Sequence, residues 1–116
     1  MESLLQDKVE ELVNYIMKKC LWQFHSRAWD RKRQNECIIA QTTQLLCGET
    51  VVPDNLADRC YWVDAVFLAE AFKKRFSWLG VMDQDGVRQL MKALHKRLDY
   101  LLITGSLNQE LTDQHY

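Results

Sequence analysis

Hydrophobic residues recur every three or four positions along most of the chain, which is the spacing of a helix that buries one side. At the N-terminus this spacing begins at about residue 4. Acidic residues come early in the segment and Lys18 and Lys19 come late, an order that complements the helix dipole. The pattern predicts a first helix whose apolar stripe consists of Leu5, Val9, Leu12, Ile16 and Cys20.

Turn-forming residues are few, since the chain has four glycines and one proline, and they mark the limits of the next helix. A second helix is predicted from about 31 to 47, with Gly48 placed as its C-terminal cap. Pro53, within GETVVPDN, marks the loop that follows. The shared face of this helix comprises Ile38, Ile39, Thr42, Leu45 and Leu46.

A third helix, from about 55 to 76, has apolar residues on two sides. One stripe comprises Leu56, Cys60, Val63 and Phe67, and the other comprises Trp62, Ala65, Ala69, Phe72 and Phe76. A helix with two apolar sides has to be covered on both of them. It is therefore either the central helix of the domain or a helix that is shared with a partner.

A fourth helix, from about 83 to 103, has a single apolar stripe. Asp83 is its expected N-cap, and Gly105 follows its end. The stripe comprises Val87, Leu90, Met91, Leu94, Leu98 and Leu101. The opposite side, which is predicted to face water, comprises Arg88, Lys92, His95, Lys96 and Asp99.

The four segments together predict an all-α fold. Residues 1–116 suit one small domain of four main helices, followed by a short helical C-terminal tail around Leu107 to Leu111. No segment shows the alternating pattern of a strand.

Composition and charge narrow the class of protein. Hydrophobic residues make up 47% of the chain and charged residues 27%, which suits a globular domain rather than a disordered one. The formal net charge of -1 disfavours a nucleic-acid binder, because such proteins usually carry a basic excess. No apolar run approaches the roughly 20 residues of a membrane span, and the acidic N-terminus does not resemble a secretory signal. We expect a cytoplasmic protein.

Residues that could carry chemistry are scattered. The four cysteines, at 20, 37, 47 and 60, share no CxxC spacing, so we expect reduced thiols rather than a metal site. His25, His95 and His115 form no cluster, and no phosphate loop or nucleophile motif occurs. Asp64 lies between the two apolar stripes, where a structural hydrogen bond is the expected role. We predict no catalytic, cofactor-binding or metal-binding residue and no independent enzymatic activity.

The segment CLWQFHSRAWDR, residues 20–31, is unusually rich in aromatic and basic residues. Three interpretations stay open: its rings are core, or they stack on nucleic acid, or they form a protein interface. The nucleic-acid interpretation uses the basic cluster at 27–33, which Asp30 and the overall charge weaken. The interface interpretation rests on the prominence of Trp, Tyr and Arg in binding hot spots. We favour the interface, because one small domain can hardly bury every ring.

Three sequence blocks resemble a known family. LVNYIMKKCLWQFHSRAWDRKRQNE, DRCYWVDAV and LDYLLITGSLNQELTDQHY, which together extend over nearly the whole chain, resemble the small delta (also called gamma) subunit of the alternative nitrogenases. The text HSRAWDR with ITGSLNQEL looks most like the iron-only branch, and a vanadium nitrogenase delta subunit is the alternative.

The resemblance implies a non-catalytic accessory subunit, present twice in a hexamer with two alpha and two beta subunits, which meets the nitrogenase reductase through that complex. It implies that the iron–iron cofactor and the iron–sulfur clusters lie in the partner subunits and that this chain packs on the cofactor-bearing alpha subunit. No contact with nucleic acid or membrane is expected. We predict that the partner interface includes Trp22, Phe24, His25, Arg27, Trp29, Arg31, Tyr61, Trp62 and Tyr116.

Overall fold

The computed structural model describes residues 2–19, 28–49 and 56–103, and within these ranges the chain is helical with no strand. The helices are α1 (Glu2–Lys19), α2 (Ala28–Leu46), α3 (Leu56–Arg75) and α4 (Gln84–Ile103), and a short 3-10 helix, η1 (Ser77–Val81), joins the last two. The predicted all-α class and the four main helices are confirmed. The predicted helical tail around Leu107 to Leu111 lies outside the described residues.

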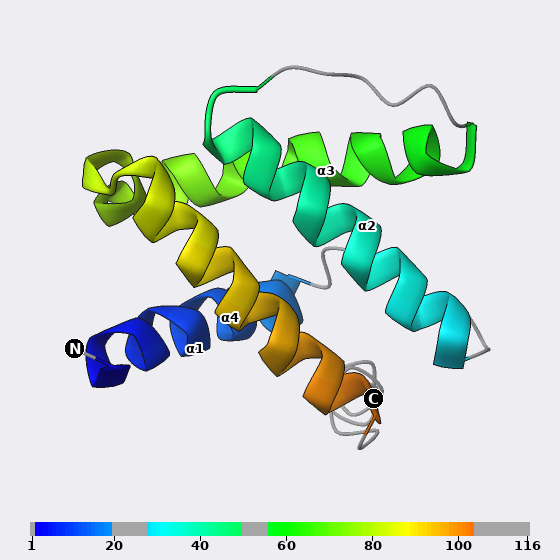
Figure 1. Ribbon diagram of the computed structural model, residues 1–116, viewed down its shortest axis with the longest axis horizontal. Helices are drawn as coiled ribbons and strands as arrows, with labels where there is room; N and C mark the ends of the chain where they lie inside the picture. Colours follow the sequence, from blue (N-terminus) through cyan, green and yellow to red (C-terminus); the bar gives the residue numbers. More distant parts are fainter. Residues whose placement is uncertain (1, 20–27, 50–55, 104–116) are drawn as a thin grey trace.

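α2 and α4 lie side by side and run in opposite directions, and α1 and α3 cross them (Figure 1). α2 packs on α3 along one side and on α4 along the other, and α4 also packs on α1. Among the described helices, α2 and α4 are therefore central, whereas α1 and α3 lie outside them. Of the two roles predicted for α3, that of central helix is wrong. The spacing of apolar residues fixes the faces of a helix but does not say which neighbour covers them.

The apolar stripe of α4 lies at the centre of the hydrophobic core. All six residues predicted for it are buried: Val87, Leu90, Met91, Leu94, Leu98 and Leu101. From α1, Val9, Leu12 and Ile16 join the same core, as predicted, together with Val13 and Met17. Because a buried aliphatic side chain contributes roughly 1.5–3 kcal/mol, this stripe is a principal source of stability.

Polar side chains also lie inside, where α2 meets α4. Asn35 is fully buried and donates from Nδ2 to Oδ1 of Asp99 at 3.0 Å. Oδ2 of the same carboxylate lies 3.4 Å from Nε2 of His95. The prediction that Asp99 and His95 face water is wrong, since both are partly buried at the edge of the apolar stripe that α2 covers.

Thr42 is a second buried polar residue of α2. Its hydroxyl donates to the carbonyl of Ile38 at 2.6 Å and lies 3.5 Å from the carbonyl of Ala65 in α3. The hydroxyl is therefore satisfied without water, and the small side chain lets α3 approach α2 closely.

Aromatic rings fix α1 against the C-terminal end of α3. The ring of Tyr15 meets the edges of Phe72 and Phe76 at centroid distances of 6.3 and 5.6 Å, and Phe76 meets Trp78 of η1 at 5.4 Å. The ammonium of Lys8 lies 5.3 Å from the centre of the Trp78 ring. Rings at these distances stabilise the contact beyond their buried area.

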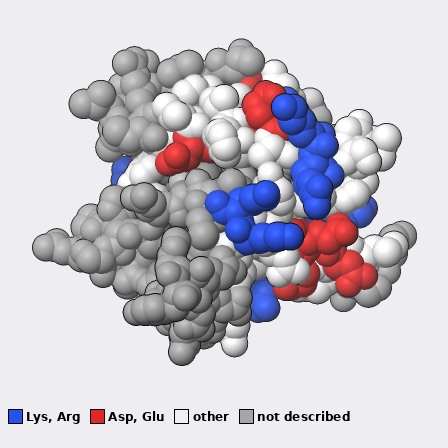
Figure 2. Space-filling view, turned by 180° about the vertical axis from the view of Figure 1, so that it is seen from behind, with Lys and Arg blue, Asp and Glu red and all other residues white. Residues whose placement is uncertain are grey.

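Charged side chains of both signs mix on the surface. In the rear view of Figure 2, basic and acidic side chains lie beside one another. An example between helices is Arg97 of α4, which donates to Oε1 of Glu10 in α1 at 2.8 Å. Basic side chains gather right of centre on this face, and acidic side chains lie at both ends of the group (Figure 2).

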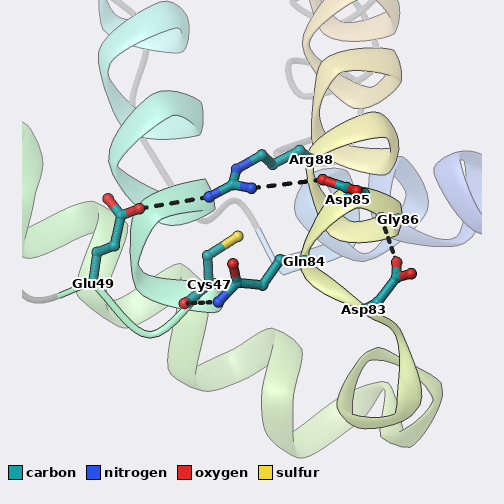
Figure 3. A network of polar contacts seen from close by, with 7 residues as sticks. All are labelled: Cys47, Glu49, Asp83, Gln84, Asp85, Gly86 and Arg88. Atoms are coloured by element: carbon teal, nitrogen blue, oxygen red, sulfur yellow. Dashed lines mark hydrogen bonds and ion pairs between the residues drawn. The ribbon is translucent and has the colours of Figure 1, made fainter.

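A polar network joins the end of α2 to the start of α4 (Figure 3). Gly48, with φ of 86°, terminates α2 as predicted, in a conformation that glycine adopts without strain. The side chain of Gln84 then donates to the carbonyl of Cys47 at 3.0 Å. The guanidinium of Arg88 lies between two carboxylates, with Nη2 3.7 Å from Oε1 of Glu49 and Nη1 3.8 Å from Oδ1 of Asp85. These contacts fix where α4 begins relative to α2.

Asp83 is the N-cap of α4, as predicted. Its Oδ1 accepts a hydrogen bond from the backbone N–H of Gly86 at 2.7 Å. We expect Asp83→Ala to lower the free energy of unfolding by about 1 kcal/mol, because that N–H loses its acceptor. Asp83→Asn retains an oxygen acceptor and should remain close to wild type. Urea denaturation of the three proteins checks this, and equal losses for both variants would contradict the cap.

Candidate protein-interaction site

The outward side of α3 carries exposed apolar side chains. Val63, Val66 and Phe67 are 68%, 37% and 62% exposed, and their spacing of i, i+3 and i+4 puts them on one side of the helix. We call these three residues the outer face of α3. The opposite side of the same helix is buried through Ala65, Leu68, Ala69 and Phe72. The predicted two-sided character of α3 is confirmed, with one side in the core and the other in solvent.

An open groove continues the outer face towards α1. It has a volume of about 350 Å³ and is lined by Tyr15, Phe67, Glu70, Ala71, Lys74 and Arg75. Tyr15, Phe67 and Ala71 supply apolar surface, and the other three supply charge. We call it the α1/α3 groove. Sequence inspection did not find it, because Tyr15 is far from the other residues in the chain.

Most of the predicted interface residues lie outside the described structure. Trp22, Phe24, His25 and Arg27 fall within 20–27, and Tyr116 falls within 104–116. Trp29 and Arg31 belong to α2, but their side chains are not among those described. These seven remain predictions.

The two predicted interface residues whose side chains are described, Tyr61 and Trp62, lie near the N-terminal end of α3. Both are half-buried, and Tyr61 packs against the hydrophobic core. The sequence-based prediction missed Val66, although its spacing of i+3 from Val63 was visible. Val66 was overlooked because it lies between the two stripes assigned to this helix.

The described residues show little else that could carry chemistry. They contain no group of three or more histidine, cysteine or acidic side chains able to hold a metal ion. Cys37 and Cys47 form no disulfide, and Cys47 is buried. A search of the described helices for a segment long and apolar enough to cross a membrane finds none.

Asp64 of α3 is partly buried beside the core side of the helix. Desolvation raises the pKa of its carboxyl above the usual range. The predicted hydrogen bond to this carboxylate is absent among the described residues. The side chain therefore carries a desolvation cost rather than a structural contact.

The chain is similar in sequence to known proteins. A family model described as the vanadium/alternative nitrogenase delta subunit matches residues 6–116. The chain belongs to this family. A relative from Rhodospirillum rubrum, named nitrogenase iron-iron protein delta chain, is 64% identical over 116 residues, the full length of both chains. Relatives with the same name occur in Azomonas macrocytogenes, 56% identical over 97% of this chain and 100% of the relative, and in Clostridium pasteurianum, 53% identical over the whole of both.

Membership of the delta-subunit family offers an explanation for the exposed apolar residues on the outer face of α3. A delta subunit is one part of a nitrogenase, so it forms a complex with other nitrogenase subunits. A chain that works inside a complex needs a surface that another subunit covers. Within the described structure, the outer face of α3 is an exposed apolar surface and therefore a candidate for this contact.

Two phenylalanines of α3 test the two-sided helix directly. Phe72 is fully buried, so Phe72→Ala should lower the free energy of unfolding of the isolated chain by about 3–5 kcal/mol. Phe67→Ala should cost less than about 1 kcal/mol, because most of that ring is already in water. Urea denaturation monitored by circular dichroism checks both. Similar losses for the two variants would show that Phe67 is a core residue.

Asp64 yields a prediction about pH. Because its pKa is raised in the folded chain, the folded state binds the proton more tightly than the unfolded state does. The stability of the fold therefore falls as pH rises from the ordinary carboxyl range through the raised pKa of Asp64. At neutral pH the carboxyl is ionised, and the full cost of desolvating its charge is present. We expect Asp64→Asn to be more stable than wild type at neutral pH, and the gain to vanish in acid, below the carboxyl pKa. Thermal unfolding at both pH values checks this, and a variant less stable at neutral pH would contradict it.

Proposed function

We propose that this chain is the delta subunit of an iron–iron nitrogenase, in which it binds and stabilises the cofactor-bearing alpha subunit without catalysing a reaction of its own. The full-length similarity to three proteins named iron-iron protein delta chains supports the iron–iron type over the vanadium type. In this proposal the iron–iron cofactor and the iron–sulfur clusters belong to the partner subunits.

The exposed outer face of α3 is the observation that carries this role. An enzyme site requires converging polar groups in a cavity, whereas the described surface of α3 presents aliphatic and aromatic side chains to solvent. Burying such side chains is the main favourable term in protein association. The aromatic and basic segment at 20–31 is a second predicted contact.

Stabilisation of the alpha subunit follows from mass action. Whichever form of that subunit the delta subunit binds more tightly becomes more populated, by an amount set by the difference in affinity. Preference for the cofactor-filled form retains the cofactor, and preference for the empty form assists its insertion. Measuring the affinity for alpha–beta complexes with and without cofactor decides between the two. Equal affinities would contradict both roles.

The predicted aromatic contacts can be tested in the complex. Trp22→Ala and Trp29→Ala should each weaken assembly with the catalytic subunits by roughly 2–4 kcal/mol if the rings are hot spots. Binding measured by calorimetry checks this, and Trp78→Ala in η1 serves as a control for the loss of a tryptophan. Unchanged binding accompanied by a large loss of the isolated chain's stability would instead assign Trp22 and Trp29 to the core.

A further inference from the structure

The outer face of α3 and the α1/α3 groove share Phe67 and form one continuous surface. Val63, Phe67 and Ala71 follow one another at i, i+4 and i+8, which makes a ridge along the helix. Val66, Glu70 and Lys74 make a second ridge with the same spacing, beside the first. Two such ridges accept the side chains of a helix laid across them, because helices pack ridges into grooves.

The groove is better suited to one anchoring side chain than to a small molecule. Its volume of about 350 Å³ lies at the low end for ligand pockets, and it opens directly onto the exposed ring of Phe67. The ring of Tyr15 closes it on the α1 side, held in place by Phe72 and Phe76. A large apolar side chain of a partner would therefore contact the ring of Tyr15, whose position is already fixed.

The charged residues at the groove favour an acidic residue on the partner, beside the apolar side chain that enters the groove. Lys74 and Arg75 line it, and Glu70 is the one acidic residue among the described lining residues. Within the described chain no carboxylate forms an ion pair with Lys74 or Arg75. Lys74 and Arg75 also interact favourably with the helix dipole, because they lie at the C-terminal end of α3. The dipole explains why cations occur at this end of the helix, but it does not explain why they line an apolar groove. A carboxylate on the partner would form ion pairs with Lys74 and Arg75.

We infer that the α1/α3 groove binds an amphipathic helix of a nitrogenase catalytic subunit, which inserts a large apolar side chain between Tyr15, Phe67 and Ala71 and places a carboxylate against Lys74 and Arg75. The inference rests on the proposed function, since it specifies which surface of the delta subunit its partner recognises. The apolar anchor supplies affinity, and the carboxylate fixes the direction of the helix and speeds association.

Charge reversal at the groove, set against charge reversal elsewhere, tests the inference. The test variant is Lys74→Glu with Arg75→Glu. Its matched control is Lys92→Glu with Lys96→Glu, which changes two exposed lysines of α4 by the same total charge. Because acids at the end of α3 oppose its dipole, Lys74→Gln with Arg75→Gln serves as a milder second variant. Circular dichroism shows which variants are folded, and binding to delta-free catalytic complex is measured at low and high salt.

We expect the groove variants to bind at least roughly tenfold more weakly at low salt, with the shallower salt dependence that follows loss of a charged contact. Phe67→Ala should weaken binding by a similar factor at both salt concentrations. The α4 control should bind as wild type does. This pattern supports the inference.

Three other results would overturn it, and they can be told apart. If wild type binds while the groove variants and the α4 control behave alike, the partner uses another surface and the proposed function survives. If the wild-type chain fails to bind any catalytic subunit, the proposed function fails as well. If the isolated chain forms a dimer that Phe67→Ala disrupts without affecting the complex, the groove holds a second copy of the chain.

Discussion

The apolar stripe of α4 is the constraint on which the rest of the structure depends. Leu90, Leu94 and Leu98 are fully buried because α2 covers one flank of the stripe and α1 covers the other. With these flanks occupied, α3 packs chiefly against α2. One neighbour can bury only one side of a helix, so Val63, Val66 and Phe67 remain in solvent. The exposed face is thus a consequence of how the core is assembled.

Polar contacts then determine how the central helices are rotated. The hydrogen bond from Asn35 to Asp99 requires particular faces of α2 and α4 to meet, whereas leucine side chains tolerate several arrangements. The contacts of Gln84 and Arg88 fix the other end of the same helix pair. A rigid arrangement of α2 keeps α3 in one position, and a docking surface that is already ordered loses less entropy when a partner binds.

The sequence predicted the elements of this fold well, because their signals are local. Gly48 and Asp83 mark helix ends through local chemistry that needs no tertiary context. The stripes of α1 and α4 emerged from spacing alone. The partners of each helix did not, since spacing gives faces and not neighbours. Asp99 and His95 were misplaced for the same reason: only the approach of α2 removes them from water.

The sequence predicted that the chain has a protein-interaction surface, but it did not predict where on the fold the candidate site lies. The sequence pattern assigned two apolar sides to α3 and placed Val63 and Phe67 on one of them, but it did not indicate which side would lie in solvent. The α1/α3 groove could not be foreseen, because it needs Tyr15 of α1 beside residues of α3 that are distant in sequence. The emphasis on the rings of residues 20–31 and on Tyr116 remains a prediction, because those side chains lie outside the described structure.

The central claim is that another subunit covers the outer face of α3, and side-chain oxidation of Phe67 tests it most directly. Phe67 and Tyr100 are similarly exposed, at 62% and 58%, and lie on different helices, so Tyr100 serves as the internal reference. Hydroxyl-radical labelling followed by mass spectrometry should modify both rings in the isolated chain. In the assembled nitrogenase, Phe67 should become protected relative to Tyr100. Equal labelling of Phe67 in the free and assembled states would contradict the account.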